Sequence, residues 1–252
     1  MQDNSATTSG IPFLALVIPA YNEQRRIAQT LEKVTSYLSM QNYSWEVIVV
    51  DDGSTDMTAS VVSNFAKDDN RLSLLSIPHG GKGSAVRAGM LHTKGQYRFM
   101  CDADLSMPIE QLARFLPDKI GNYDLALGSR EISGAERFKE PPYRHLMGRL
   151  FNAFVRIMAV PGFMDTQCGF KCFVGNVADN LFSLQRINGF AFDVEIMYLA
   201  TRKRLKIKEV PIDWHYDKES KVRPVRDSLL MAANILRIHW ASLTGKYGQL
   251  GS

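Results

Sequence analysis

The sequence predicts an α/β protein with a mostly parallel β-sheet flanked by helices. Several short apolar runs are rich in β-branched residues and end in turn signals, and segments with helical periodicity lie between them. Strands that alternate with helices are typical of βαβ units, which build parallel sheets. The strand-like runs are continuously apolar rather than alternating, as expected when helices cover both faces of a sheet.

The predicted strands lie in the first half of the chain. In order, they are FLALVIP (13–19), WEVIVVDDG (45–53), LSLLSIP (72–78), YRFMCDAD (97–104) and YDLALGSR (123–130). Residues 27–38 carry apolar side chains at helical spacing and predict the first helix. A second helix is expected after Ser54, and a third around Val86–Leu91.

The pattern changes after about residue 130. The polar, proline-containing stretch Ser133–Pro142 is expected to form an ordered loop or lid. Helical patterns follow in RHLMGRLFNAFVRIMAV (144–160), FDVEIMYLATRKR (192–204) and DSLLMAANILRIHWASL (227–243). We therefore expect a flexible tail over residues 1–10, a main domain over 11–222 with its halves at 11–130 and 131–222, and a C-terminal helix over 223–246.

The C-terminal helix is apolar over most of its surface. One apolar stripe along it consists of Leu229, Ala233, Leu236, Trp240 and Leu243. Further apolar residues on its other faces are Met231, Ile235 and Ile238. Such a helix needs cover from its own domain, from a second subunit or from lipid, and packing on its own domain is the preferred reading.

The chain is mildly basic, with a formal net charge of +4 that is concentrated toward its C-terminus. From Arg202 onward there are 11 Lys and Arg against 5 Asp and Glu, whereas residues 1–201 hold 19 against 21. The densest basic run, RKRLKIK (202–208), is interpreted as a solvated helix end, with an anionic membrane or phosphate group as the alternative. We expect no nucleic-acid partner.

The three cysteines, Cys101, Cys168 and Cys172, are expected to be reduced thiols. Their number is odd, and the spacing of the last two, without a nearby histidine, is a poor zinc pattern. Reduced thiols are typical of cytosolic proteins. No apolar run approaches the length of a membrane span, and we expect no signal peptide at the start of the chain.

Polar and glycine-rich motifs follow four of the predicted strands. They are PAYNE (19–23), DDGSTD (51–56), PHGGKG (78–83) and DADLS (102–106). Because ligands of open parallel sheets bind beyond the carboxyl ends of the strands, these motifs are expected to meet in one site. An aromatic ring, several carboxylates, a glycine-rich turn with a lysine and a pair of acids together predict a nucleotide site.

Asp102 and Asp104 carry the chemistry of this predicted site. Burying unpaired carboxylates is costly, and two of them one residue apart can share a hard divalent cation. The cation would also bind a diphosphate and neutralise it as a leaving group. Solvent, a helix N-terminus, an arginine or a simple loop start are the alternatives that the acid pair alone leaves open.

The remaining motifs fit the same ligand. The glycine-rich turn at 80–83 lets the backbone approach closely, and Lys82 within it can meet anionic oxygens. Asp51 or Asp52 can hydrogen-bond a base or a ribose. Ser54 and Asp56 are expected to cap the following helix.

Two common nucleotide-binding motifs are absent from the sequence. No G-x-G-x-x-G follows the first strand, and no G-x-x-x-x-G-K-[ST] occurs anywhere. These absences disfavour a dinucleotide-dependent dehydrogenase and a P-loop NTPase.

In their order along the chain, VIPAYNE, VIVVDDGSTD, GGKGSAVRAG, DADLSMP and GSR resemble the motifs of family 2 glycosyltransferases of the GT-A fold. DTQCGFK (165–171) and FAFDVEI (190–196) resemble those of polyprenyl- or dolichyl-phosphate hexose synthases, above all the dolichyl-phosphate β-glucosyltransferase type. The resemblance covers roughly residues 12–222. It implies a nucleotide-binding half before residue 130 and an acceptor-side half after it.

The resemblance also implies a donor site and a metal site. The implied donor-binding residues are Pro19, Ala20, Tyr21, Glu23, Asp51, Asp52, Lys82, Asp102, Ala103 and Asp104. Asp102 and Asp104 match the D-x-D motif that holds Mg²⁺ or Mn²⁺ on the diphosphate. Ser106 stands where many related synthases have glutamine, which puts a third metal contact there in doubt.

The implied catalytic residues are Asp193, Arg130 and Lys221. Asp193, with Glu195 nearby, resembles an acceptor-side acid of inverting relatives, and Lys221 resembles a basic residue that closes over the site. The resemblance makes Arg130 of GSR and Arg144 candidates for binding phosphate groups of the donor or the acceptor.

The implied reaction is inverting transfer of a hexose, most directly glucose from UDP-glucose, to a polyprenyl or dolichyl phosphate. A phosphate acceptor is already anionic at neutral pH, so it can attack without a general base, and Asp193 would orient or repel it. The product would be β-linked. The implied setting is the cytoplasmic face of a membrane, with the protein attached peripherally through its basic C-terminal third and last helix. A homodimer is a further partner that we consider.

The sequence is compatible with three alternatives. The first is the same fold with a GDP-mannose donor or a soluble acceptor. A nucleotide-sugar pyrophosphorylase is disfavoured because the first strand is not followed by a glycine- and arginine-rich segment. A non-catalytic binder of nucleotide sugars is disfavoured because it has no need of the D-x-D motif, Lys82 and Arg130 together.

Overall fold

The computed structural model describes residues 10–216 and 224–248, without the side chains of Arg144, Leu146, Leu150, Phe151 and residues 224–229. Its strands are β1 (Leu14–Ala20), β2 (Trp45–Asp51), β3 (Leu72–Ser76), β4 (Tyr97–Cys101), β5 (Leu125–Ser129), β6 (Glu136–Phe138), β7 (Phe170–Val174), β8 (Ile207–Pro211) and β9 (Asp213–His215). Its helices are α1 (Ile27–Ser39), α2 (Thr58–Asp68), α3 (Lys82–His92), the 3₁₀ helix η1 (Ile109–Phe115), α4 (Pro117–Ile120), α5 (Pro142–Met158), α6 (Gly175–Leu184), α7 (Phe192–Arg202) and α8 (Pro224–Leu243).

The main sheet has seven strands in the order β3-β2-β1-β4-β7-β5-β8. The pairs of β1 with β2 and β4, of β2 with β3, and of β5 with β8 are parallel. Only β7 runs antiparallel to its neighbours in this sheet, β4 and β5. The predicted α/β fold with a mostly parallel sheet is confirmed, and each of the five predicted strands is present.

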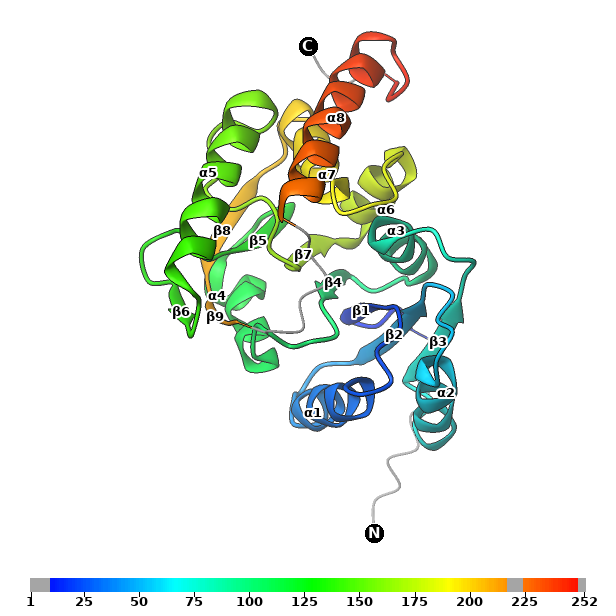
Figure 1. Ribbon diagram of the computed structural model, residues 1–252. Coiled ribbons are helices and arrows are strands. Elements are labelled where there is room, and N and C mark those ends of the chain that lie inside the picture. Colours follow the sequence, from blue (N-terminus) through cyan, green and yellow to red (C-terminus); the bar gives the residue numbers. More distant parts are fainter. Residues whose placement is uncertain (1–9, 217–223, 249–252) are drawn as a thin grey trace.

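Helices cover both faces of the sheet (Figure 1). On one face α1, α2 and η1 pack around residues such as Leu16 and Phe99. On the other face α3, α5, α6, α7 and α8 pack around residues such as Val17 and Met100. Because neighbouring residues of one strand point to opposite faces, β1 and β4 supply side chains to both cores, which explains their continuously apolar sequences.

The antiparallel strand β7 is the feature that the alternating pattern did not predict. It lies between β4 and β5, with Phe170 opposite Cys101. The start of β7 therefore lies beside the end of β4, at the edge of the sheet where the acid pair follows. A segment from the second half of the chain is thus part of the edge formed by the first half.

The polar stretch 133–142 is only partly a loop. It contains β6, which forms a small parallel sheet with β9, and Phe138 stacks on His215 with 4.6 Å between ring centroids. This pairing attaches the stretch to the segment that follows β8. The described cysteines are free and buried, in agreement with the expected reduced thiols.

The C-terminal helix α8 packs on its domain through a different face from the predicted stripe. Met231, Ile235 and Ile238 are buried, whereas Leu236 and Trp240 are 63% and 58% exposed. The preferred packing of this helix on its own domain is thus seen, and periodicity alone did not indicate which of the two apolar rows makes the contact. Among the described residues, no helix has both the length and the apolar character needed to cross a bilayer.

Close packing of α3 on the sheet gives a stability prediction. A methyl group at Gly89 would lie 2.4 Å from Val17 Cγ1 and 2.8 Å from Val50 Cγ2, so α3 or the strands would have to shift. We expect Gly89→Ala to lower the free energy of unfolding by about 1–3 kcal/mol, as overpacked cores do. Urea denaturation would measure this change.

Gly148→Ala is the matched control, because this helical glycine of α5 has no atom within 4 Å of the added methyl group. Its replacement should leave stability unchanged or raise it by up to about 1 kcal/mol. Equal effects of the two substitutions would contradict the close packing of α3.

Candidate active site

The candidate site lies at the carboxyl ends of the parallel strands β1, β2 and β4. Pro19 and Ala20 end β1, Asp51 ends β2, and Asp102 follows β4 directly. The Asp52 N–H donates to Ala20 O at 2.9 Å and continues the pairing of β1 and β2 into the loops. The structure thus brings the four predicted motifs to one edge of the sheet.

Asp52 fixes the glycine-rich turn to the end of β2. Asp52 is only 2% exposed, and its carboxylate accepts the N–H groups of Gly80 and Gly81 at 2.8 and 2.9 Å. His79 Nδ1 lies 2.9 Å from the same carboxylate. Asp52 therefore shapes the turn. Because its carboxylate oxygens already accept these hydrogen bonds, they have fewer acceptor sites left for a ribose than the sequence implied.

His79 is a residue that the sequence interpretation missed. Its ring stacks on Tyr21, with 4.2 Å between centroids and 23° between planes. Its place immediately before the glycine-rich turn was the available signal. The stacked rings provide a flat aromatic surface next to Asp52, and such a surface is a suitable neighbour for a nucleobase.

The loops after β1 and β2 are bound to each other. Ser54 Oγ accepts the Asn22 N–H at 2.9 Å, and Thr58 Oγ1 accepts the Glu23 N–H at 2.8 Å. The predicted capping role of Ser54 is therefore wrong, because its hydroxyl is used between loops. Asp56 does bind the first N–H of α2, that of Thr58, at 2.9 Å.

Lys82 and Asp102 form the central ion pair of the site, with 2.6 Å between Nζ and Oδ1. Lys82 is the first residue of α3, so the glycine-rich turn sets the position of its side chain. Burial would lower the pKa of Lys82, but the charges of Asp102, Asp193 and Asp104 raise it above its ordinary value. Lys82 thus stays an ammonium group at the point where a diphosphate is expected.

The acid pair has a donor set suited to a hard divalent cation. The pKa of Asp104 is raised, first by shielding of its carboxyl group from water and then by the negative charge of Asp102. A cation between them would relieve this repulsion. A Cβ at Gly169 would lie 1.9 Å from Asp102 Oδ2, so glycine at the start of β7 leaves space for that carboxylate.

Two carboxylates supply only part of a coordination shell. Within residues 10–216 and 224–248, no three His, Cys, Asp or Glu side chains form a group that would hold a metal ion. Mg²⁺ characteristically binds one or two protein carboxylates together with substrate phosphates and water. Asp102 and Asp104 fit that kind of shared site, in which a donor diphosphate completes the ligands.

Asp193 lies buried at the start of α7 and forms an ion pair with Lys171 of β7, 2.6 Å apart. Burial raises the pKa of Asp193, an effect that the ammonium groups of Lys171 and Lys82 reduce. Lys171 Nζ also donates to Cys168 O at 2.6 Å. Asp193 is thus next to the Lys82–Asp102 pair, but its charge is already neutralised by a lysine that the sequence interpretation did not select.

Glu195, unlike Asp193, does not lie beside the Lys82–Asp102 pair. It is fully buried, and its carboxylate accepts the N–H groups of Arg186 and Ile187 and the hydroxyl of Tyr247. Of the two acids in FAFDVEI, only Asp193 belongs with the acid pair.

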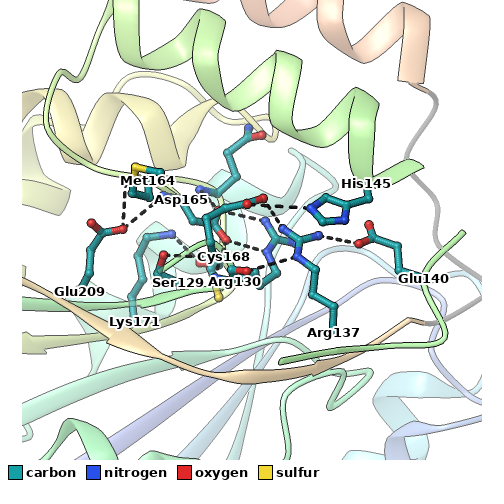
Figure 2. Close-up of polar contacts among 12 residues, drawn as sticks. Ser129, Arg130, Arg137, Glu140, His145, Met164, Asp165, Cys168, Lys171 and Glu209 are labelled. Atoms are coloured by element: carbon teal, nitrogen blue, oxygen red, sulfur yellow. Dashed lines mark hydrogen bonds and ion pairs between the residues drawn. The ribbon is translucent and has the colours of Figure 1, made fainter. Parts of the chain in front are cut away.

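Arg130 is held by Asp165, as Figure 2 shows. Its Nε and Nη2 atoms donate to the two Asp165 oxygens at 2.6 and 2.9 Å, and Asp165 is completely buried. Burial would raise the pKa of Asp165, but the guanidinium group more than offsets this and lowers it. The Arg130 guanidinium also lies 5.5 Å above the centre of the Trp214 ring. Two of its donors are thus already used within the protein.

A second arginine, Arg137 of β6, lies beside this pair (Figure 2). It donates to Glu131 and, at 2.6 Å, to Glu140. His145 of α5 lies 4.0 Å from Glu131, so α5 begins next to this cluster. The other two basic candidates cannot be placed, because Lys221 and the side chain of Arg144 lie outside the described residues.

The Arg130–Asp165 pair gives a second stability prediction. We expect Asp165→Asn to lower the free energy of unfolding at pH 7 by about 3–5 kcal/mol, because the guanidinium of Arg130, whose side chain is only 21% exposed, loses its counter-charge. Since the folded-state pKa of Asp165 is lowered, its contribution is complete above its unfolded pKa of about 3.9 and is lost as the pH falls through the folded-state pKa. The difference in the free energy of unfolding between wild type and Asp165→Asn should thus be constant from pH 8 to about pH 5 and become smaller only below about pH 4.

Asp69→Asn is the control, because the Arg71–Asp69 pair has the same chemistry with side chains 46% and 24% exposed. It should cost at most about 1 kcal/mol. Urea denaturation over the pH range would measure both variants. A deficit for Asp165→Asn no larger than that of Asp69→Asn would contradict the role of the buried pair.

Comparison with known proteins places this site in a family. Residues 15–176 match the family described as Glycosyl transferase family 2. A dolichyl-phosphate beta-glucosyltransferase of Trichomonas vaginalis is 35% identical over 90% of this chain and 70% of its own length. Those of Saccharomyces cerevisiae and Homo sapiens are 34% and 33% identical, each over 93% of this chain and 76% and 77% of their own lengths.

Solved structures agree with this result at the level of the fold. Glucosyl-3-phosphoglycerate synthase from Mycobacterium tuberculosis, in complex with phosphoglyceric acid, aligns with a TM-score of 0.65 and 19% identity over 90% of this chain and 80% of that chain. The same enzyme with Mn²⁺, UDP-glucose and phosphoglyceric acid aligns with a TM-score of 0.62 and 19% identity over 96% of this chain and 81% of that chain. The expected GT-A fold is therefore confirmed. With the family match and the curated relatives, these alignments show that the chain is a glycosyltransferase of family 2.

Proposed function

We propose that this glycosyltransferase moves glucose from UDP-glucose to dolichyl phosphate or a related polyprenyl phosphate, with inversion at the sugar. The observation that carries the proposal is the Lys82–Asp102–Asp104 group at the carboxyl end of β4. Its ammonium group suits a nucleoside diphosphate, and its two carboxylates suit the divalent cation that such a diphosphate binds. The acceptor follows from the names of the relatives, which match 90% or more of this chain. The donor follows from the UDP-glucose bound to a structural neighbour.

The donor would lie across the ends of β1, β2 and β4. The base would lie against Tyr21 and His79, with Asp51 at the base or ribose and the Pro19–Ala20 segment and Glu23 around it. The diphosphate would meet Lys82, and its oxygens would complete the ligands of Mg²⁺ or Mn²⁺ on Asp102 and Asp104. When bound, this cation would neutralise charge that develops on the leaving diphosphate.

The transfer step needs no proton acceptor. A non-bridging oxygen of the acceptor phosphate attacks the anomeric carbon and forms the new carbon–oxygen bond. The bond to the β-phosphate of the donor breaks, and UDP leaves with the electron pair. Attack from the opposite side gives a β-linked lipid phosphate sugar from an α-linked donor.

Asp193 would orient the acceptor in this scheme. Its pairing with Lys171 places an ammonium and a carboxylate side by side in a buried position. Arg130, with Arg144 and Lys221, would supply cationic contacts to phosphate groups of the donor or the acceptor. For Arg130 this requires that the donors not used by Asp165 reach the ligand.

A GDP-mannose donor with the same acceptor is the second candidate function. The stack of Tyr21 and His79 can accommodate either base, because stacking on an aromatic ring discriminates weakly between bases. The first half of the chain, 11–130, would bind either donor, and the half 131–222 would face the acceptor.

We also propose that the protein works at the cytoplasmic face of a membrane, to which it attaches peripherally, because its acceptor would be a lipid. A long polyprenyl chain stays in the bilayer while its phosphate is at the surface.

Product formation is the direct test of this proposal. The purified protein would be incubated with a short polyprenyl phosphate, Mn²⁺ or Mg²⁺, and either UDP-glucose or GDP-mannose. We expect a metal-dependent β-linked glucolipid from UDP-glucose. Asp102→Asn should lower its rate by about 10²-fold or more, as does loss of charge stabilisation in other enzymes.

Asp118→Asn is the control, because this acid is 66% exposed on the surface and should leave the rate unchanged. A mannolipid from GDP-mannose alone would favour the second candidate. An α-linked product, or hydrolysis of the donor without lipid product, would contradict the proposal.

A further inference from the structure

The crossing of α5 and α8 exposes a group of large apolar side chains. We call it the α5–α8 surface, and it consists of Phe154, Ile157, Met158, Leu236, Trp240 and Leu243. Ile157 and Leu243 are 81% and 88% exposed. Single exposed apolar residues are ordinary, but a contiguous group of this kind marks an interaction site.

These six residues form one surface because the two helices touch. His239 Nε2 of α8 lies 2.6 Å from Met158 O of α5, which places Met158 and Trp240 near each other. Figure 1 shows α5 and α8 at the same end of the molecule, away from α1 and α2. Tyr143 and Met147 extend the group, because they lie on the same stripe of α5 as Phe154 and Met158 and are also exposed.

The charged residues that α5 and most of α8 carry are of one sign. The α5 sequence contains three arginines and no Asp or Glu, and α8 has no acid after Asp227. Arg149 and Arg237 are exposed, and Lys246 Nζ lies 3.9 Å above the Trp240 ring. Apolar side chains with tryptophan and tyrosine, on helices whose charged residues are cations, are typical of helices that lie in the interface of an anionic bilayer.

We propose that the α5–α8 surface is the membrane-docking surface of this enzyme and takes an anionic lipid bilayer as its partner. The proposal deepens the proposed function and rests on it, because it names the surface by which the enzyme reaches a lipid acceptor. The geometry fits that role, since α5 begins beside the Arg137 cluster, where His145 approaches Glu131. A lipid phosphate at the bilayer surface next to α5 is thus close to the acceptor-side half of the chain.

Vesicle co-sedimentation tests the docking surface without substrate. The full chain would be mixed with phosphatidylcholine vesicles with and without phosphatidylserine. We expect binding to the anionic vesicles, and at least about tenfold weaker binding by the double variant Leu236→Glu, Trp240→Glu. Both residues are exposed, so thermal unfolding of the variant should match the wild type.

Met40→Glu is the matched control, because Met40 is 77% exposed at the end of α1, on the other face of the sheet, and should leave vesicle binding unchanged. Absence of wild-type binding, or equal binding by the double variant, would overturn the proposal. A wild-type dimer that the double variant dissociates, measured by light scattering, would also overturn it and assign the surface to a second copy. Transfer to a short, water-soluble acceptor should be equal in wild type and double variant, so failure of the docking surface and failure of the proposed function give different results.

The buried carboxylate of Glu195 connects the segment after α8 with residues 185–188. Tyr247, after α8, donates to its Oε1 at 2.6 Å, and the Ile187 N–H donates to its Oε2 at 2.8 Å. The segment 185–188 that Glu195 holds lies against the start of α3. There Gln185 Nε2 donates to Gly83 O at 2.8 Å, and the Ser84 N–H donates to Asn188 O at 3.1 Å.

We infer that Glu195 is a positioning residue for Lys82, through segment 185–188 and the first turn of α3. A methyl group at Gly83 would lie 2.8 and 2.9 Å from the carbonyl oxygens of Ile187 and Asn188, so the two segments are in close contact. A shift of 185–188 would therefore move the turn that places Lys82 on Asp102. This inference also rests on the proposed function, since Lys82 would bind the donor.

Substitution of Tyr247 tests the positioning role by removing a single hydrogen bond to Glu195 and leaving its carboxylate in place. We expect Tyr247→Phe to raise the KM for the nucleotide sugar on the order of tenfold and to leave the KM for the acceptor unchanged. Glu195→Gln, which keeps the shape but loses the charge, should have a larger effect of the same kind. Tyr37→Phe, at a buried tyrosine of α1, is the control.

UDP binding, followed by calorimetry, separates this inference from the proposed reaction, because it needs no turnover. Weaker UDP binding by Tyr247→Phe, with binding by Tyr37→Phe unchanged, would support the positioning role. Lower thermal stability with unchanged UDP affinity would overturn it and leave Glu195 a purely structural residue.

Discussion

The ion pair between Lys82 and Asp102 is the interaction on which the rest of the site depends. Among the described residues, three carboxylates, those of Asp102, Asp104 and Asp193, lie near one edge of the sheet with two lysines, Lys82 and Lys171. Buried charge is tolerated only when it is paired, so each lysine is in contact with a carboxylate. The remaining negative charge is on Asp104, whose pKa is raised first by burial and then by the charge of Asp102. A divalent cation with a diphosphate is a ligand that this distribution of charge is suited to receive.

The same constraint explains why both halves of the chain meet at this edge. The antiparallel strand β7 places its start beside the end of β4, and Gly169 there leaves room for the Asp102 carboxylate. Lys171, two residues further on, reaches Asp193. The donor side and the acceptor side are thus connected through paired charges rather than through a linker. A substitution in either half that moves Lys82 or Gly169 would therefore move the Asp102 carboxylate.

Much of this architecture could be predicted from the sequence. The continuously apolar strands and the motifs at their ends were sufficient for the parallel sheet and for the group around Asp102, because these signals are local. The insertion of β7 could not be predicted, since it depends on pairing between distant segments. For the same reason the pairing of Arg130 with Asp165, the separation of Asp193 from Glu195 and the stack of His79 on Tyr21 became visible only in the fold. The sequence left the buried face of α8 open because two of its faces are apolar.

Anomalous diffraction from crystals grown with Mn²⁺ and UDP would show whether the acid pair binds a metal together with a nucleotide. We expect one strong manganese peak between the carboxylates of Asp102 and Asp104, with diphosphate oxygens as further ligands. We also expect Lys82 to leave Asp102 and contact the diphosphate. A nucleotide bound elsewhere, or Lys82 still paired with Asp102 and no manganese at the acid pair, would refute the metal and donor site.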